Sequence, residues 1–93
     1  MSAYVVVHAK IKDSEKMQTY GAGAGPVVAA HGGEVIARGP STLLHGESQY
    51  DLMVMLQFPT REAAETWYNS DDYQALIPTR DAAMDSVFFL GGE

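Results

Sequence analysis

The chain has 93 residues, of which 46% are hydrophobic and 19% are charged, and this composition predicts one folded domain and excludes a disordered segment. It contains no cysteine, so disulfides and thiolate metal sites are excluded. The formal charge is −6, and the six basic residues are scattered without forming a patch, which makes nucleic acid and anionic membranes poor partners.

The first elements in the chain are a predicted strand and a predicted helix. Residues 3–11 are rich in β-branched side chains and uninterrupted, as in a buried strand. No basic stretch precedes them and no apolar run reaches about 18 residues, so we expect no signal peptide, no membrane span and a cytoplasmic protein. Asp13 is placed to cap a helix that begins at Ser14, and Gly32-Gly33 is placed to end it.

The run YGAGAGP over residues 20–26 resembles a phosphate-binding loop at first sight. Such a loop leaves a strand and opens a helix, whereas this run lies inside a helical pattern that has already begun. We interpret it as a weakened helix that Pro26 restarts at a first-turn position. A helix kink that opens the mouth of a pocket is the alternative.

The rest of the chain alternates predicted strands and helices. A strand is predicted over 34–38, followed by a turn or bulge at 39–41, and a continuation of the strand over 42–45 is left open. The next strand covers 50–58 and is ended by Pro59, and a last strand covers 85–92. Between these two strands we expect a helix from Thr60 to about 69 and a helix from 71, which Ser70 caps and Pro78 interrupts or restarts. The order β-α-β-β-α-β predicts a single α+β domain over 1–93 with a ferredoxin-like fold, in which helices cover one face of a four-stranded antiparallel sheet.

Apolar side chains occupy both faces of the predicted strands. The set expected on the face without helices is Tyr4, Val6, Met53, Met55 and one of the two phenylalanines at 88 and 89. Monomers rarely expose apolar patches of this size, so we expect a homodimer joined sheet to sheet. The alternative is a monomer with an apolar sheet surface.

The sequence resembles the family DUF1330, a domain of unknown function. The residues that carry the resemblance are Tyr20, Pro26, His31-Gly32-Gly33, Arg38-Gly39, Glu47, Phe58-Pro59 and, most specifically, WYNSDDYQALIPTR from Trp67 to Arg80. The resemblance spans residues 4–92 and implies the dimeric α+β barrel group, which includes cofactor-independent oxygenases, isomerases, haem-processing enzymes and ligand-sensing dimers. Asp71-Asp72 departs from the proline and glutamate that often follow the serine in this family.

Two arginines are candidates for binding an anion. Arg80 shares a helical stripe with Tyr73 and Leu76, so its charge needs a carboxylate or a bound anion. A structural ion pair with Glu47, a bond to a terminal carbonyl or a snorkelling side chain is the alternative. Arg38 ends the second strand and is placed either to grip an organic carboxylate or to remain a solvated charge.

Four further side chains lie around the junction of the last two helices. Trp67 offers an apolar wall or plain core, and Tyr73 offers a hydroxyl. Ser70 is placed as a helix cap whose neighbouring amides also suit an anion, and Asn69 is placed to bind either a ligand carbonyl or the loop backbone.

The histidines give no metal signature. His31 lies at a helix end, where it serves either as a cationic cap or as a general base. His8 and His45 lie on strands without matching partners, so no metal site is expected. No histidine lies in the last two helices, where the haem-processing relatives would place an axial ligand, so no haem is expected.

We therefore expect a homodimer whose pocket between sheet and helices binds a small organic acid or polar aromatic without a cofactor. One hypothesis is an enzyme of the proton-transfer, isomerase or oxygenase type, with Arg38 and Arg80 holding the anion, Tyr73 and Ser70 hydrogen-bonded to it, and His31 moving a proton. The other is a non-catalytic ligand-binding or sensor dimer. A pocket filled by side chains, with no ligand, is a third.

Overall fold

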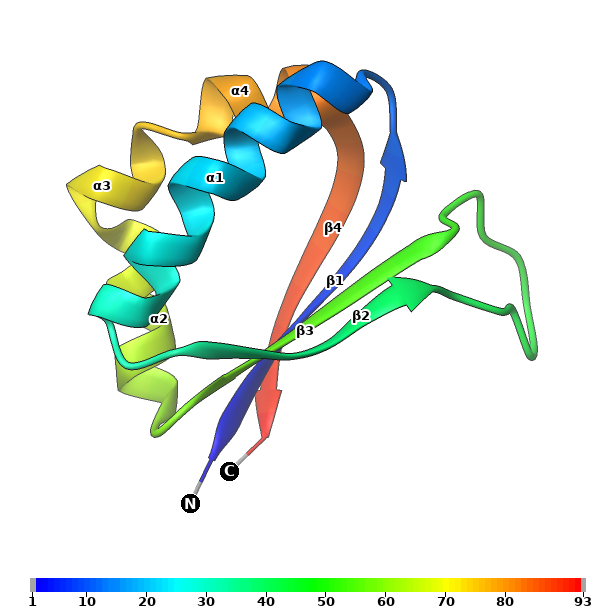
Figure 1. Cartoon of the computed structure of the whole chain (residues 1–93). Coiled ribbons are helices and arrows are strands. Elements are labelled where there is room, and N and C mark those ends of the chain that lie inside the picture. Colours follow the sequence, from blue (N-terminus) through cyan, green and yellow to red (C-terminus); the bar gives the residue numbers. More distant parts are fainter. Residues whose placement is uncertain (1, 93) are drawn as a thin grey trace.

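A computed structural model describes residues 2–92 of the chain. The elements are β1 (Ala3–Ile11), α1 (Ser14–Ala30), β2 (Glu34–Pro40), β3 (Leu52–Phe58), α2 (Arg61–Asn69), α3 (Asp71–Gln74), α4 (Ile77–Ala83) and β4 (Met84–Gly92). The strands form one four-stranded antiparallel sheet in the order β2-β3-β1-β4 (Figure 1). The predicted ferredoxin-like fold is confirmed.

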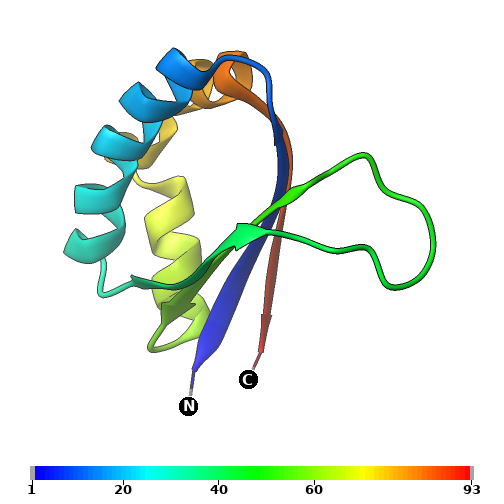
Figure 2. The ribbon, with the colours of Figure 1, turned by 45° about the vertical axis from the view of Figure 1, so that its right-hand side comes forward.

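All the helices lie on one side of the sheet (Figures 1 and 2). The alternation in β1 explains this arrangement, because Val5, Val7 and Ala9 are buried under the helices while Val6 and His8 between them point to the other face. No helix within residues 2–92 has both the length and the apolar character needed to cross a membrane.

The face of the sheet without helices carries the apolar patch that the sequence predicts. Val6 of the central strand β1 lies between Met55 of β3 and Phe89 of β4. Phe89 is 55% exposed, whereas its neighbour Phe88 points to the helices and packs against Tyr68. Because side chains along β4 alternate between the two faces of the sheet, Phe89 and not Phe88 belongs to this open face.

Helix α1 is continuous through the glycine run, so the predicted restart at Pro26 is wrong. Asp13 caps the helix as predicted by accepting a hydrogen bond from the Lys16 amide at 3.1 Å, and Gly32 at φ 81° ends it. Packing explains the continuity. A Cβ added at Gly23 would lie 2.9 Å from Leu76, so the missing side chain lets the helix approach that residue closely.

Three strand boundaries differ from the sequence prediction. The strand β2 runs on to Pro40 instead of ending at residue 38, and its bulge lies between Val35 and Ala37 instead of at 39–41. The strand β3 begins at residue 52 instead of 50, and β4 begins at 84 instead of 85. The open question of a continuation over 42–45 is answered, because these residues are not in a strand. Residues 41–51 form a loop that projects away from the helices (Figures 1 and 2). Pro40 has no amide to extend the ladder, and beyond the Ser41–Asp51 backbone bond of 3.0 Å the two chain segments separate.

The last helices are short, and side chains cap the first two of them. Thr60 caps α2 through the Ala63 amide at 3.0 Å, and Ser70 caps α3 through the Tyr73 amide at 3.2 Å, as predicted. Pro78 lies in the first turn of α4, where a missing amide costs nothing. These turns bring Trp67 and Tyr73 into the core, where they are the largest fully buried side chains together with Phe58.

Candidate functional site

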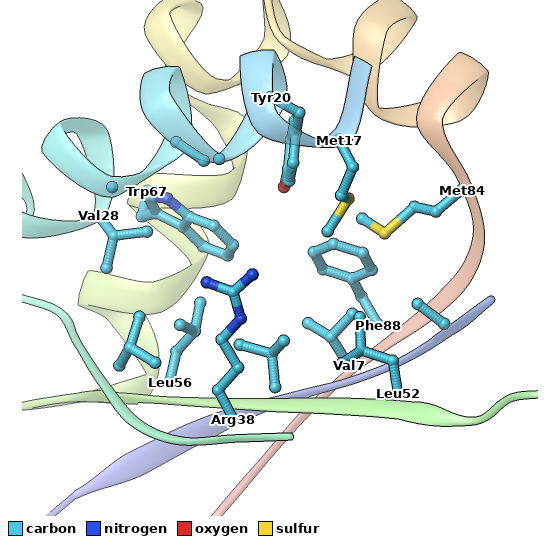
Figure 3. A pocket seen from close by; sticks show the side chains of 16 residues that line it. Val7, Met17, Tyr20, Val28, Arg38, Leu52, Leu56, Trp67, Met84 and Phe88 are labelled. Carbon is cyan, nitrogen blue, oxygen red and sulfur yellow. The ribbon is translucent and has the colours of Figure 1, made fainter. Parts of the chain in front are cut away.

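A cavity of about 220 Å³ lies between α1 and the helix-covered face of the sheet (Figure 3). Helix α1 forms one side, the strands form the floor, and Trp67 of α2 lies beside it. Its lining is mostly apolar and includes Val7, Met17, Leu52, Leu56, Met84 and Phe88. The cavity therefore suits a ligand with an apolar body.

Arg38 is the charged residue in this lining. It lies on β2 opposite Val54 of β3, and its guanidinium reaches from the floor into the cavity (Figure 3). None of the ion pairs formed within residues 2–92 involves Arg38. A guanidinium stays charged in proteins and donates in a fork that matches a carboxylate, so this position favours an organic anion in the cavity.

Three tyrosines and Arg80 form a hydrogen-bonded chain that reaches the same cavity. Arg80 Nη1 donates to the Tyr68 hydroxyl at 3.0 Å and to the Tyr73 hydroxyl at 3.2 Å. The Tyr73 hydroxyl lies 2.8 Å from that of Tyr20, which lines the cavity and points its oxygen into it (Figure 3). The chain therefore connects a cation outside the cavity lining with a hydroxyl inside it.

Arg80 is satisfied by protein groups. Its side chain is 12% exposed, donates from Nε to Asp81 at 3.1 Å and lies 5.0 Å from the centre of the Phe88 ring. Within the described residues its ion pair is with Asp81 and not with Glu47, so the structural ion pair is present but the predicted partner is wrong. Burial lowers the pKa of Arg80, but the hydrogen bonds to Tyr68 and Tyr73 outweigh burial and leave the pKa raised. Its charge is thus permanent.

Burial also sets the protonation state of the two buried tyrosines. It raises the pKa of Tyr20, and the neighbouring Tyr73 raises it further. Burial raises the pKa of Tyr73 as well, against the hydrogen bonds with Tyr20 and Arg80, which lower it. Both hydroxyls are therefore protonated at neutral pH and serve as hydrogen-bond donors, not as bases.

Trp67 combines the two roles that the sequence left open. It is 1% exposed and packs on Phe58 and Tyr73 in the core, and it also lines the cavity. Its indole Nε1 is buried without a hydrogen-bond partner in the described chain. An unpaired buried donor of this kind is rare in a folded protein.

The other predicted site residues lie away from this cavity. Ser70 caps α3 and donates to the Trp67 carbonyl at 2.8 Å, and Asn69 donates to the Glu65 carbonyl at 3.0 Å. His31 lies at the end of α1, outside the lining. The structure thus places Arg38 and Trp67 together in the cavity lining, and it links Tyr73 and Arg80 to the cavity by hydrogen bonds through Tyr20.

A second hollow of about 340 Å³ lies beside α2 and β4. Its lining includes Glu65, Tyr68 and Asn69, and it shares Trp67 and Phe88 with the first cavity.

Within residues 2–92, no three histidine, aspartate or glutamate side chains come together as a metal site would require.

Tyr20 is the functional candidate that sequence reasoning missed. The helical periodicity of α1 placed it on the buried stripe, but a tyrosine on such a stripe was not assigned a site role. One signal was available. A buried hydroxyl needs a partner, and Tyr73 was the other tyrosine expected on a core-facing stripe.

The fold and the cavity define a small α+β protein of ferredoxin-like topology with a candidate small-molecule site between helices and sheet. The chain belongs to the family described as Domain of unknown function (DUF1330), which matches residues 2–91. The resemblance expected from the sequence is confirmed. A search of the curated proteins found no match.

Solved structures share the fold at low sequence identity. The protein RPA0582 of unknown function from Rhodopseudomonas palustris is 20% identical with a TM-score of 0.82, over 99% of this chain and 82% of that one. SnoaB, a cofactor-independent oxygenase from Streptomyces nogalater, is 13% identical with a TM-score of 0.70, over 99% and 92%. A dimeric ferredoxin-like protein of unknown function from Thermobifida fusca is 14% identical with a TM-score of 0.67, over 100% and 92%.

Proposed function

We propose that this protein binds a small organic acid in the cavity between α1 and the sheet, with Arg38 holding the carboxylate. The observation that carries the proposal is the Arg38 guanidinium, which reaches into a mostly apolar lining without an ion-pair partner among residues 2–92. Arg38 is exposed, so its charge is solvated when the cavity is empty, and its fork of donors is free to bind an anion that brings opposite charge and two acceptor oxygens.

The size of the cavity supports a ligand built on a single ring. An apolar cavity of about 150 Å³ holds benzene, so about 220 Å³ leaves room for a ring with one or two substituents. Trp67 and Phe88 offer aromatic surfaces to such a ring, and Met17 and Met84 offer adaptable ones.

A screen of aromatic and short aliphatic acids by thermal shift tests this proposal. A ligand that binds the folded state raises the unfolding temperature with its concentration. We expect Arg38→Met to abolish this stabilisation, and Arg61→Met, which removes the same charge from the exposed start of α2, to retain it. Equal stabilisation of the Arg38→Met variant and the parent would disprove the role of Arg38.

We also propose that the functional unit is a homodimer in which a second copy covers the open face of the sheet. The apolar patch formed by half-buried Val6, Met53 and Met55 and by exposed Phe89 supports this arrangement, as does the dimeric ferredoxin-like protein of the same fold. Sedimentation should give about twice the chain mass of 10.1 kDa. Phe89→Asp should give the single chain mass, whereas a parent protein that sediments at the single chain mass would overturn the proposal.

Catalysis without a cofactor on the bound acid is the second candidate function, with proton transfer, isomerisation or oxygenation as the reaction type. The Tyr20 hydroxyl favours it, because a buried donor at the cavity stabilises negative charge that develops on a substrate oxygen. SnoaB shares the fold and is a cofactor-independent oxygenase. Mass spectrometry of ligands found in the screen distinguishes the two candidates, since a binding protein forms no product.

Four residues that were predicted from the sequence to act directly in the site have indirect or untested roles in this proposal: His31, Asn69, Ser70 and Tyr73. Tyr73 acts through Tyr20, and Ser70 positions Trp67 and Tyr73 by capping α3. His31→Gln and Asn69→Ala test whether residues outside the cavity lining affect turnover. No change in either variant would restrict the site to Arg38, Trp67 and the tyrosine chain.

A further inference from the structure

The hydrogen bonds that run from Arg80 to Tyr73 and from Tyr73 to Tyr20 can both be satisfied in only one direction. Arg80 has donors only, so the Tyr73 oxygen accepts its bond at 3.2 Å. Tyr73 is 0% exposed, and its own proton needs an acceptor; the Tyr20 oxygen at 2.8 Å is the acceptor that the described residues provide. Tyr73 therefore donates to Tyr20.

This direction leaves the Tyr20 proton without a protein acceptor among residues 2–92. The Tyr20 oxygen points into the cavity, where the lining carbons accept no hydrogen bond (Figure 3). Across the cavity, the Arg38 guanidinium points inward from the opposite side (Figure 3). The cavity thus has two polar ends separated by apolar walls.

We infer that Tyr20 is the hydrogen-bond donor to a second oxygen of the ligand, and that Arg80 and Tyr73 are positioning residues that fix and polarise this donor. Hydrogen bonds in a chain polarise one another, and here the chain begins at a half-buried cation beside Tyr68 and Phe88. The inference rests on the proposed function and makes it more specific.

The arrangement defines a substrate class. The ligand carries a carboxylate for Arg38 at one end and a carbonyl or enolate-type oxygen for Tyr20 at the other, with an aromatic or short aliphatic body between them. Keto acids and acyl-substituted aromatic acids meet this description. An acid of the same shape that lacks the second oxygen leaves the Tyr20 proton unpaired and binds less well.

A pair of acids of matched shape tests the inference. We would measure, by calorimetry on the intact protein, the affinities for 4-acetylbenzoate and 4-isopropylbenzoate, which differ in the carbonyl group. The preference for the acetyl compound should fall about tenfold in Tyr20→Phe, with little change in the affinity for the isopropyl compound. Arg61→Met is the control that should leave both affinities unchanged.

The preference for the acetyl compound also tests the positioning role of Arg80 and Tyr73. Arg80→Met and Tyr73→Phe should lower the same preference, and Arg80→Lys should restore part of it by supplying a cationic donor. If these variants weaken both acids equally, Arg80 and Tyr73 have a structural role and the inference is wrong. An unchanged preference in Tyr20→Phe also overturns it.

The proposed function and this inference fail in different ways. Loss of isopropylbenzoate binding in Arg38→Met supports the proposed function, whatever the preference between the two acids. Isopropylbenzoate binding that does not depend on Arg38, or no binding of either acid by the parent, overturns the proposed function and, because it rests on it, this inference.

Discussion

The glycine run in α1 gives a prediction in which stability and chain geometry are tested together. Gly21 and Gly25 are exposed helical residues at the edge of the cavity lining, and a Cβ added at either would meet no atom within 4 Å. Gly23 lies between them, and a Cβ there would lie 2.9 Å from Leu76. The three positions share one helix and one chemistry but differ in available space.

The magnitude follows from helix propensity. Glycine in a helix interior is about 1 kcal/mol less favourable than alanine, so the Gly21→Ala/Gly25→Ala double variant should be about 2 kcal/mol more stable. For a domain of this size that gain raises the unfolding temperature by about 8–16 °C. In Gly23→Ala the Leu76 side chain must move, which offsets part of the gain at that position.

Urea denaturation at a fixed protein concentration measures these differences. The single tryptophan, Trp67, is buried in the core and reports unfolding by fluorescence. A fixed concentration is needed because a dimer gains apparent stability with concentration. The Gly23→Ala variant serves as the matched control on the same helix.

A double variant that is no more stable than the parent would refute this reasoning. It would mean that residues 21–25 need a conformation that alanine does not adopt, as the kinked-helix alternative requires. A second outcome concerns a bound acid. If the double variant is more stable than the parent without the acid but not with it, the added methyl groups lie against the ligand.

Three further predictions follow from single contacts. Stability should fall as pH rises above about 10, because burial raises the folded-state pKa of Tyr20 and Tyr73 above the ordinary value of 10.0 and favours their neutral forms; a Tyr20→Phe/Tyr73→Phe variant should lose less in alkaline denaturation. Ser70→Ala should cost about 1 kcal/mol in urea denaturation through loss of the α3 cap, and no loss would contradict that role. Leu44 is 93% exposed, so Leu44→Ser should change stability by less than about 0.5 kcal/mol; a larger loss would indicate that this loop contacts a second copy.

Much of the fold was predictable because local rules dictate it. Alternating side chains in β1 and β3 set the two faces of the sheet, and Asp13, Thr60 and Ser70 set helix starts through side-chain bonds to nearby amides. The restart at Pro26 was wrong because tertiary packing on α1 outweighs local helix weakness.

The candidate site was predictable only in part. Arg38 and Trp67 were assigned from the sequence, and both line the cavity. Arg80 was assigned to the same anion, but its bonds to the tyrosine hydroxyls and to Asp81 place it outside the lining. The helical spacing that Arg80 shares with Tyr73 and Leu76 correctly predicted that its side chain is turned toward the core. It did not predict the partner of Arg80, since several groups satisfy a guanidinium in such surroundings equally well.

The sequence by itself determined the order of the elements, the antiparallel ferredoxin-like sheet and the apolar character of both its faces, since these follow from the period of side chains along each strand and helix. The tertiary structure alone decided that Tyr20 meets Tyr73, 53 residues away, and that Arg38 faces Tyr20 across the cavity. The physical reason is that such contacts depend on the height and rotation of α1 above the sheet. Periodicity defines which face of a helix is buried, but only close packing of side chains decides which residues meet there.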